Sequence, residues 1–433
     1  MLNKTILFFS FIVITSAFAY AGGEDSLDNH VFQGTIQPGF SRLNVLYDPD
    51  LSIRVGAEDI LTMHYGITRG EDKLLGTSWF AEQTVLGKTG GILLRTAKYT
   101  FLDLPLDVCS FIFAHEYFGH GGHIRELGFN DILFHFNMPP PYGHGSAFTQ
   151  FYPNPFSLST PEYLSIYEGG IESQTILGRT IALRWMATGE INYRDADLYL
   201  LSLWGNMSYI QSTSNEISTP GSDPELYLKS LNAQCGFTDV KNLKMTVAAF
   251  KSKMKLSLAN PFYYFSMYYF LKTYLWDGNT ASVFPTFHFG RVRYLPVLRS
   301  GMTPFGPDYH LENYLRFGET TSLIDIRVGD QTFYSSWGGI GFTFLKISTW
   351  GKCSADANVN IWKQPDMILG GTPGSAKGGG FGGAFSVRGY YDFSESNNSF
   401  SAAVELGYKS VGFLEGYSLN ASPIIIIGLG YRL

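Results

Sequence analysis

The chain has 433 residues and a formal net charge of −6 at pH 7, so no large basic field marks nucleic acid as a partner. Charged residues make up 16% of the chain, against roughly 25% in typical soluble domains, while aromatic residues also make up 16% and there are 48 glycines. This composition favours a protein whose strands contact membrane lipids over a cytosolic enzyme.

The first 21 residues have the pattern of a secretory signal peptide. Lys4 precedes an apolar run from Ile6 to Ala19, and small residues at Ala17 and Ala19 form an A-x-A cleavage site. An uncleaved membrane anchor is the alternative. Residues 22–88 then contain short strand-like stretches at 31–40, 51–57 and 77–87. We expect these stretches to belong to the same sheet as strands near the C-terminus.

Residues 89–278 are expected to be mainly helical, and one of these helices carries the sequence FAHEYFGHGGHIRELG at 113–128. His115 and His120 are five residues apart, one more than in the H-E-x-x-H zinc box. In a regular helix Glu116, His120 and His123 would share a face, which would make Glu116 a metal ligand. With a one-residue bulge His115 and His120 would converge, and Glu116 would remain as a general base.

The glycines at 119, 121 and 122 favour the bulge, because glycine weakens the regular helix. Aligned on His120, the stretch resembles the helix of the site-2 protease family, whose pattern is roughly H-E-x-G-H-x-x-x-A-R-x-x-G. Gly119, His120, Arg125 and Gly128 are in register, Ile124 replaces the alanine, and one extra residue follows His115-Glu116. The resemblance covers only 113–128 and the family's second motif is not found. It therefore implies metallopeptidase-like chemistry and not membership.

A catalytic zinc ion needs three protein ligands, and a carboxylate must accept a proton from its water. In glutamate-type zinc peptidases the third ligand is a glutamate on a later helix, and YEGGIESQTILGR at 167–179 offers Glu168 and Glu172. The predicted site therefore has Glu116 as general base and His115, His120 and Glu172 as ligands, with His123 and Glu168 as alternates. Zinc is the expected ion, and iron or manganese would accept the same ligand types. The alternative is a structural cluster of hydrogen bonds.

Residues 279–433 alternate between apolar and polar side chains, as strands do. In LIDIRVG (323–329) the apolar residues Ile324, Ile326 and Val328 are opposite Asp325 and Arg327. Such segments separated by turns are typical of a membrane barrel. The final PIIIIGLGYRL resembles the closing strand of bacterial outer-membrane barrels, although the chain ends on Leu433 and not on an aromatic residue. A soluble secreted sandwich or barrel is the alternative.

The predicted fold class is α+β: a membrane-type antiparallel β-barrel, built from 22–88 and 279–433, combined with a central all-α metallopeptidase-like region at 89–278. The predicted function is a zinc-dependent hydrolase in the outer membrane of a Gram-negative-type bacterium. Its partners would be membrane lipids and a peptide, or another substrate with an acyl or amide bond. The alternative function is a non-enzymatic outer-membrane barrel with a helical plug, used in transport or assembly, in which the His/Glu cluster is structural.

Overall fold

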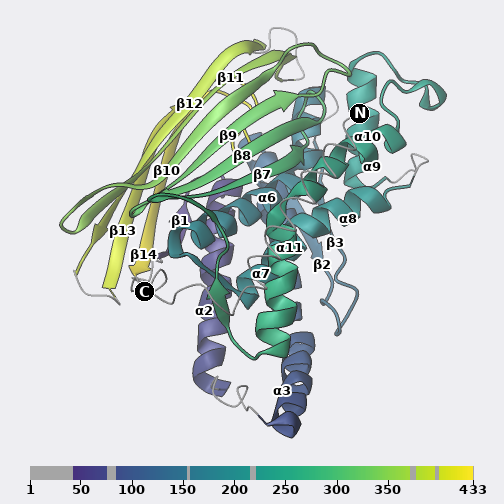
Figure 1. Cartoon of the computed structure of the whole chain (residues 1–433). Helices are drawn as coiled ribbons and strands as arrows, with labels where there is room; N and C mark the ends of the chain where they lie inside the picture. Colours follow the sequence, from purple (N-terminus) through teal and green to yellow (C-terminus); the bar gives the residue numbers. More distant parts are fainter. Residues whose placement is uncertain are drawn as a thin grey trace.

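The computed structural model describes residues 42–75, 84–153, 157–214, 221–370, 377–394 and 399–432. One large antiparallel sheet curves over a group of helices (Figure 1), so the predicted α+β class is confirmed. The expected signal peptide, 1–21, the strand-like stretch 31–40 and residues 77–83 of the stretch 77–87 lie outside the described residues. Residues 85–87 of that stretch belong to a helix, not to the expected strand.

The large sheet has ten strands in the order β1-β14-β13-β12-β11-β10-β9-β8-β7-β6, and each pairs antiparallel with its neighbours. Because β1 pairs with β14, with Val45 opposite Leu429, part of the region 22–88 does join the C-terminal strands. The bounds are β1 Arg42–Tyr47, β6 Phe287–Phe289, β7 Val292–Gly301, β8 Asp308–Phe317, β9 Thr320–Gly329, β10 Gly338–Trp350, β11 Cys353–Ile368, β12 Lys377–Asp392, β13 Ser399–Lys409 and β14 Ser422–Arg432.

The sheet is not closed into a barrel within the described residues, because β1 and β6 form its two edges and do not pair with each other. Helices pack against its concave side instead, and α6 (Thr160–Thr188) contacts β8 and β9. The prediction of an antiparallel sheet is therefore confirmed, while closure of that sheet is not observed. The helices cover one face of the sheet, so that face is buried although the edges of the sheet do not meet.

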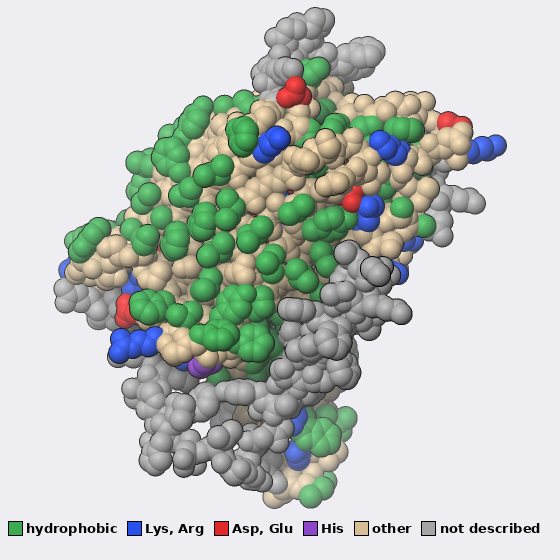
Figure 2. All heavy atoms as spheres, turned by 45° about the horizontal axis from the view of Figure 1, so that its top comes forward, with side chains coloured by type: hydrophobic (Ala, Val, Ile, Leu, Met, Phe, Trp, Pro, Cys, Tyr) green, Lys and Arg blue, Asp and Glu red, His purple; other side chains and the backbone are tan. Residues whose placement is uncertain are grey.

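The apolar face of the strands is turned outward. Leu406 is 58% exposed and Ile425, directly opposite it on β14, is 55% exposed. Glu405, the residue next to Leu406 on β13, points to the other face and is buried. Strand β9 has the same arrangement, with the apolar Ile326 exposed and the charged Arg327 buried. Figure 2 shows apolar side chains spread over this outer face of the sheet. Apolar side chains outside and charged ones inside is the reverse of a soluble sandwich.

The helical region begins earlier than expected, because residues 53–75 form helix α2 (Ile53–Leu75) in place of the strand expected at 51–57. Ile53, Ala57, Ile60 and Leu61 are buried at helical spacing, and the alternation in 51–57 is too short to tell the two periods apart. No helix within the described ranges combines the length and apolar character needed to cross a membrane.

The region 89–278 is mainly helical, as expected, with a two-stranded sheet of β2 (Ile132–Phe136) and β3 (Ala147–Phe151) inserted in it. A second small sheet pairs β4 (Glu190–Asn192) with β5 (Ala281–Val283). The remaining α-helices are α3 Val85–Lys98, α4 Leu104–Phe113, α5 Gly121–Glu126, α7 Tyr193–Tyr199, α8 Gly205–Ser212, α9 Asp223–Gln234, α10 Val247–Met254 and α11 Pro261–Tyr268.

Helix α6 is the central element, and its ends are defined by sequence signals. Ser159 and Glu162 form a capping box at its N-terminus, and Gly189 ends it in the left-handed conformation with φ 76°. Leu177, Ile181 and Trp185 on this helix are fully buried in the main core. Because α6 packs against both the sheet and the histidine helix, it fixes the position of the candidate site.

Candidate metal centre

The histidine stretch contains the bulge that its spacing indicated. Residues Ala114–His120 form a π-helical segment between α4 and α5, in which Gly121 N–H donates to Glu116 O. This i→i+5 bonding takes up one extra residue per turn. His115 and His120 therefore project toward the same place, with their ring centroids 4.8 Å apart.

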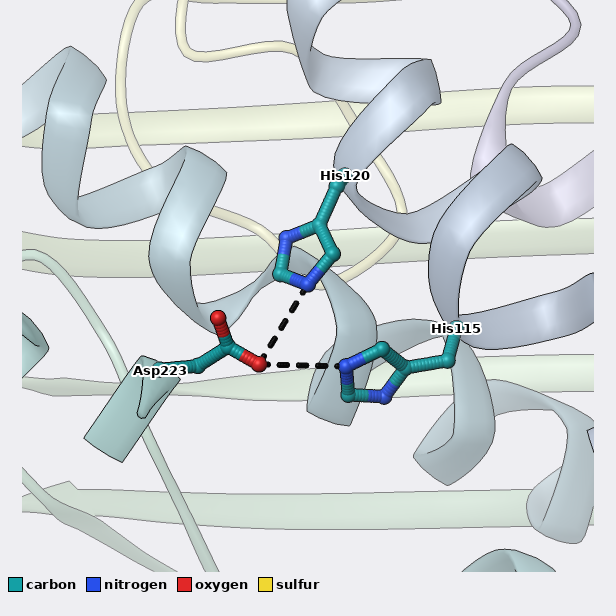
Figure 3. Close-up of side chains that lie close together, drawn as sticks. All are labelled: His115, His120 and Asp223. Atoms are coloured by element: carbon teal, nitrogen blue, oxygen red, sulfur yellow. Dashed lines mark hydrogen bonds and ion pairs between the residues drawn. The ribbon is translucent and has the colours of Figure 1, made fainter. Parts of the chain in front are cut away.

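The two histidines meet a carboxylate from helix α9 (Figure 3). His115 Nε2 lies 3.1 Å and His120 Nε2 lies 3.4 Å from the same oxygen, Asp223 Oδ2. One ligand atom from each residue can be chosen so that all three lie within 4.8 Å of one another. The side chains of His120, His115 and Asp223 are 8%, 12% and 22% exposed, so the group is open to solvent mainly on the side of Asp223.

The spacing of these atoms fits a zinc ion. Zinc binds imidazole nitrogen and carboxylate oxygen at about 2.0–2.2 Å in a tetrahedron, which places ligand atoms about 3.3–3.5 Å apart. The two distances from Asp223 Oδ2, 3.1 Å and 3.4 Å, are close to this spacing. Three protein ligands leave one position for a water or a substrate oxygen, as in catalytic zinc sites.

Two of the three candidate ligand side chains, His120 and Asp223, are oriented by a further hydrogen bond. His120 Nδ1 lies 2.6 Å from Ile166 O of α6, so its Nδ1–H donates and Nε2 is left to bind a metal. Tyr209 Oη donates to Asp223 Oδ2 at 3.1 Å and accepts from Asp223 N–H at 3.2 Å. Burial lowers the pKa of His120, but Asp223 outweighs it and raises this pKa to about 9. Burial also raises the pKa of Asp223, and His120 more than reverses that effect.

Glu116 lies beside the group and not in it. Its Oε2 accepts a 2.6 Å hydrogen bond from Thr149 Oγ1 on strand β3, and the residue is 5% exposed. The negative charge of Glu116 also contributes to the raised pKa of His120, so the carboxylate lies near that imidazole. It is not one of the three residues that form the group. This is the arrangement expected if the bulge leaves Glu116 as a base.

Glycines allow the histidine segment to lie against α6. A Cβ on Gly119 would come within 2.6 Å of Gly169 O, and a Cβ on Gly170 would overlap the His115 ring. Larger residues at these positions would push the two helices apart. The close approach puts His115 over Gly170 and His120 against the Ile166 carbonyl.

Glu172, expected as the third ligand, lies outside this group. Its Oε2 is 2.6 Å from His123 Nε2, and its Oε1 accepts from Gly416 N at 2.5 Å. His123 Nδ1 lies 2.9 Å from Glu126 Oε2, so both nitrogens of this expected alternate are already engaged by carboxylates. The physical reason is that α6 meets the histidine segment through Gly169 and Gly170, which leaves Glu172 facing the next histidine along, on α5.

Glu168, the other expected alternate, is fully buried, and neither of its carboxylate oxygens has a hydrogen-bond partner in the described part of the chain. Burial raises the pKa of Glu168, and the charge of Glu172 raises it further. Burial therefore favours the neutral form of this carboxyl group beside the His123–Glu172 pair. It lies apart from the His115, His120 and Asp223 group, of which it is not a member.

The Glu172→Gln substitution separates a structural role for this glutamate from a ligand role. The substitution removes the charged partner of His123 from a buried pair, which typically costs about 3–5 kcal/mol. We therefore expect the free energy of unfolding to fall by about that amount. The zinc bound per folded chain should stay unchanged. Chemical denaturation and elemental analysis measure the two quantities. A loss of zinc with unchanged stability would place Glu172 in the metal centre after all.

A second group of metal-ligand residue types, His310, Glu312 and Asp325, lies on the inner face of β8 and β9. Two guanidinium groups already bind it: Arg299 Nε lies 2.9 Å and Arg179 Nε 3.2 Å from Glu312 Oε1. These cations neutralise the carboxylates and take up their lone pairs. The His115, His120 and Asp223 group has no such competing cation among the contacts of the described residues, so it is the better metal site.

Asp223 and Tyr209 could not be identified from the histidine stretch. The signal for Asp223 is the capping box S-D-P-E at 222–225, in which Ser222 and Glu225 cap α9. That signal places Asp223 in the first turn of a helix, but no spacing rule links it to His120. Only the packing of α9 against α6 brings the carboxylate to the histidines.

Comparison with known proteins adds no relative to this description. No protein-family model, no curated protein and no solved structure matches the chain.

Proposed function

We propose that this protein is a zinc-dependent hydrolase that acts on a peptide or another acyl or amide bond. The observation that carries the proposal is the convergence of His115 Nε2 and His120 Nε2 on Asp223 Oδ2, at 3.1 Å and 3.4 Å, with Glu116 beside them. Two imidazoles and one carboxylate are a ligand set that zinc prefers in catalytic sites, and iron and manganese accept it too.

A zinc ion bound there would lower the pKa of a water to near 7 and polarise a substrate carbonyl. Glu116 then serves as the general base that accepts the proton of the attacking water and delivers it to the leaving group. The Thr149 hydroxyl, which donates to Glu116 Oε2, fixes the direction of this carboxylate. Tyr209 holds Asp223 in place through two hydrogen bonds.

The proposal is tested by measuring metal content and hydrolysis together in two variants. Asp223→Asn should lose both properties, whereas Glu116→Gln should keep the metal and lose hydrolysis. Fluorescent casein and p-nitrophenyl acetate are suitable probes, because they report amide and ester cleavage without a known natural substrate.

We propose further that the sheet lies in the outer membrane with its outer face against lipid. Three features support this location: the signal-peptide pattern of 1–21, the terminal strand, and an outer face on which Leu406, Ile425 and Leu429 are more than half exposed. Apolar patches of this kind on a soluble surface mark interaction sites. Closing the sheet into a barrel would require the edges β1 and β6 to meet.

Lipid contact through the sheet predicts a specific loss of membrane binding. Replacing Leu406 and Ile425 together by lysine costs up to about 2–4 kcal/mol for each lysine near the middle of a bilayer. We expect the variant to float with liposomes at least tenfold less than the wild-type chain. Leu74→Lys, at a position 87% exposed at the end of α2, is the matched control and should float normally. Equal flotation of the double variant would exclude lipid contact through this face.

One observation favours the alternative, a non-enzymatic membrane protein in which the helices plug the sheet for transport or assembly. The concave side of the sheet carries many charged side chains and borders a cavity of about 560 Å³ between the helices and the strands. In that case the histidine group would be structural. Zinc bound at His115, His120 and Asp223 without any hydrolysis would favour the alternative.

A further inference from the structure

The cavity on the concave side of the sheet is separate from the metal centre. It lies between helices α2 and α6 and the inner faces of β9 to β12, and its volume is about 560 Å³, within the range of small-molecule sites. Helix α6 contributes residues from Ile176 to Ala187, whereas the histidines contact this helix at Ile166 and Gly170. The cavity lining contains more Arg and Lys than Asp and Glu side chains, although the whole chain is acidic.

Arg327 stands out among the cavity arginines because its guanidinium is poorly paired. Its side chain is only 5% exposed, and its nearest carboxylate atom, Asp308 Oδ2, is 3.9 Å from Nε, which is too long for a hydrogen bond. Within the described residues no acceptor takes a hydrogen bond from this guanidinium. Asp308 lies closer to another cation, with Oδ1 3.1 Å from His310 Nε2.

Two other cavity arginines, Arg54 and Arg388, are paired with a carboxylate. Arg54 Nη2 lies 2.6 Å from Glu405 Oε1, and Arg388 Nη2 lies 2.7 Å from Glu405 Oε2. Besides its distant carboxylate, Arg327 has among the described residues only the Phe413 ring, whose centroid lies 6.0 Å from its Cζ. A guanidinium with so little exposure and no hydrogen-bonded acceptor is costly. The cost is offset when an oxyanion accepts two parallel hydrogen bonds from it.

Two glycines hollow out the sheet next to Arg327. Gly339 is its direct neighbour on β10, and a Cβ there would lie 3.3 Å from Arg327 Nη2. Gly341 faces the same cavity beside Asn360, whose amide donates to Asn358 Oδ1. A side chain at Gly339 would crowd the Arg327 guanidinium, and one at Gly341 would displace the end of the Asn360 side chain, so either would narrow the cavity here.

We infer that this cavity binds a small amphiphilic oxyanion, a carboxylate or phosphate monoester carrying a short alkyl chain, with Arg327 as its anchor. The guanidinium supplies paired donors that match either headgroup, and the amide of Asn360 lies beside the same hollow. Opposite the strands, Leu61, Ile176 and Leu183 give the cavity an apolar wall that suits the alkyl chain. The inference does not depend on the metal centre.

Calorimetric titration of the purified full chain tests the inference with four probes of equal chain length: hexanoate, hexyl phosphate, hexanol and hexylamine. We expect at least one of the two anions to bind saturably, and hexanol and hexylamine to bind at least tenfold more weakly. The anion with the higher affinity identifies the headgroup. Arg327→Gln should weaken the anion at least tenfold. Arg293→Gln is the matched control, because Arg293 lies on the same sheet, outside the cavity lining, and should bind normally.

Gly341→Val keeps the charge and fills the hollow, so it tests the same point if Arg327→Gln does not fold. The first atom that a Cβ at Gly341 meets is the end of the Asn360 side chain, and valine is favoured in strands. We expect this variant to fold and to lose the anion. Failure of both anions to bind the wild-type chain would overturn the inference. So would hexanol binding as tightly as the anion, or unchanged anion affinity in Gly341→Val.

Discussion

The Asp223→Asn variant is expected to retain less than a tenth of the zinc bound by the wild-type chain at equal free zinc. Asp223 Oδ2 is the atom on which both histidine nitrogens converge, and an amide oxygen is a neutral and weaker zinc ligand than a carboxylate. Even replacing a residue that only hydrogen-bonds to a metal ligand commonly lowers metal affinity 10–100-fold. Elemental analysis after dialysis against a zinc buffer gives the ratio.

Two measurements make this result specific. Asn has the size of Asp and remains acceptable in the first turn of α9, so the variant should keep its fold by circular dichroism. Its free energy of unfolding should fall, because the contacts of the Asp223 carboxylate with His115 and His120 are lost together with its favourable interaction with the helix dipole. The pKa of His120 is about 9 without metal, so zinc binding below pH 9 must release a proton. We therefore expect wild-type zinc affinity to fall as the pH is lowered from 9. Equal zinc in Asp223→Asn and wild-type protein would refute the proposed centre.

The bulge in the histidine helix was predictable, because it follows from local sequence. A spacing of five between His115 and His120 does not fit one face of a regular helix, and Gly119, Gly121 and Gly122 lower the cost of irregularity. The structure has the π-helical segment at Ala114–His120. The residues that favour the bulge and the histidines that it brings together lie within a few positions of one another. Interactions over such short distances along the chain are the easiest to predict from sequence.

The third ligand was not predictable in the same way. Its place on a returning helix makes Glu172 the expected third ligand. Whether its side chain reaches His120 or His123 depends on how α6 is rotated and shifted along the histidine segment. That register is set by the contacts of Gly119 with Gly169 and of His115 with Gly170. Asp223 enters from a helix that has no sequence relation to the histidines. Tertiary packing alone decides between the two carboxylates.

The fold shows a similar division. Alternation in β9 and β13 correctly separated Ile326 from Arg327 and Leu406 from Glu405, but the pattern itself does not say which face is covered. In the structure the charged face is covered, because Arg179 of α6 reaches Glu312 and Asp325 on the strands. Whether a sheet closes depends on its curvature and on what fills its concave side, and neither is encoded in the alternation of single strands.

Glu116→Gln is expected to keep zinc at the wild-type level and to lower kcat/KM for hydrolysis by about 10²–10⁴-fold, the usual contribution of a general base. Glutamine preserves the size of the side chain and can still accept from Thr149 Oγ1, which now binds Glu116 Oε2 at 2.6 Å. It cannot accept a proton from water. The reaction would therefore lose its base while His115, His120 and Asp223 continue to hold the metal.

Glu168→Gln is the matched control for this prediction. It makes the same chemical change at a buried glutamate that lies outside the metal group, and burial raises the pKa of that carboxyl group, which favours its neutral form. Zinc content and hydrolysis should both stay near the wild-type level. Loss of zinc in Glu116→Gln would make Glu116 a ligand, which would require the helix to be regular where the structure has a bulge. Full activity in Glu116→Gln would remove Glu116 from the chemistry.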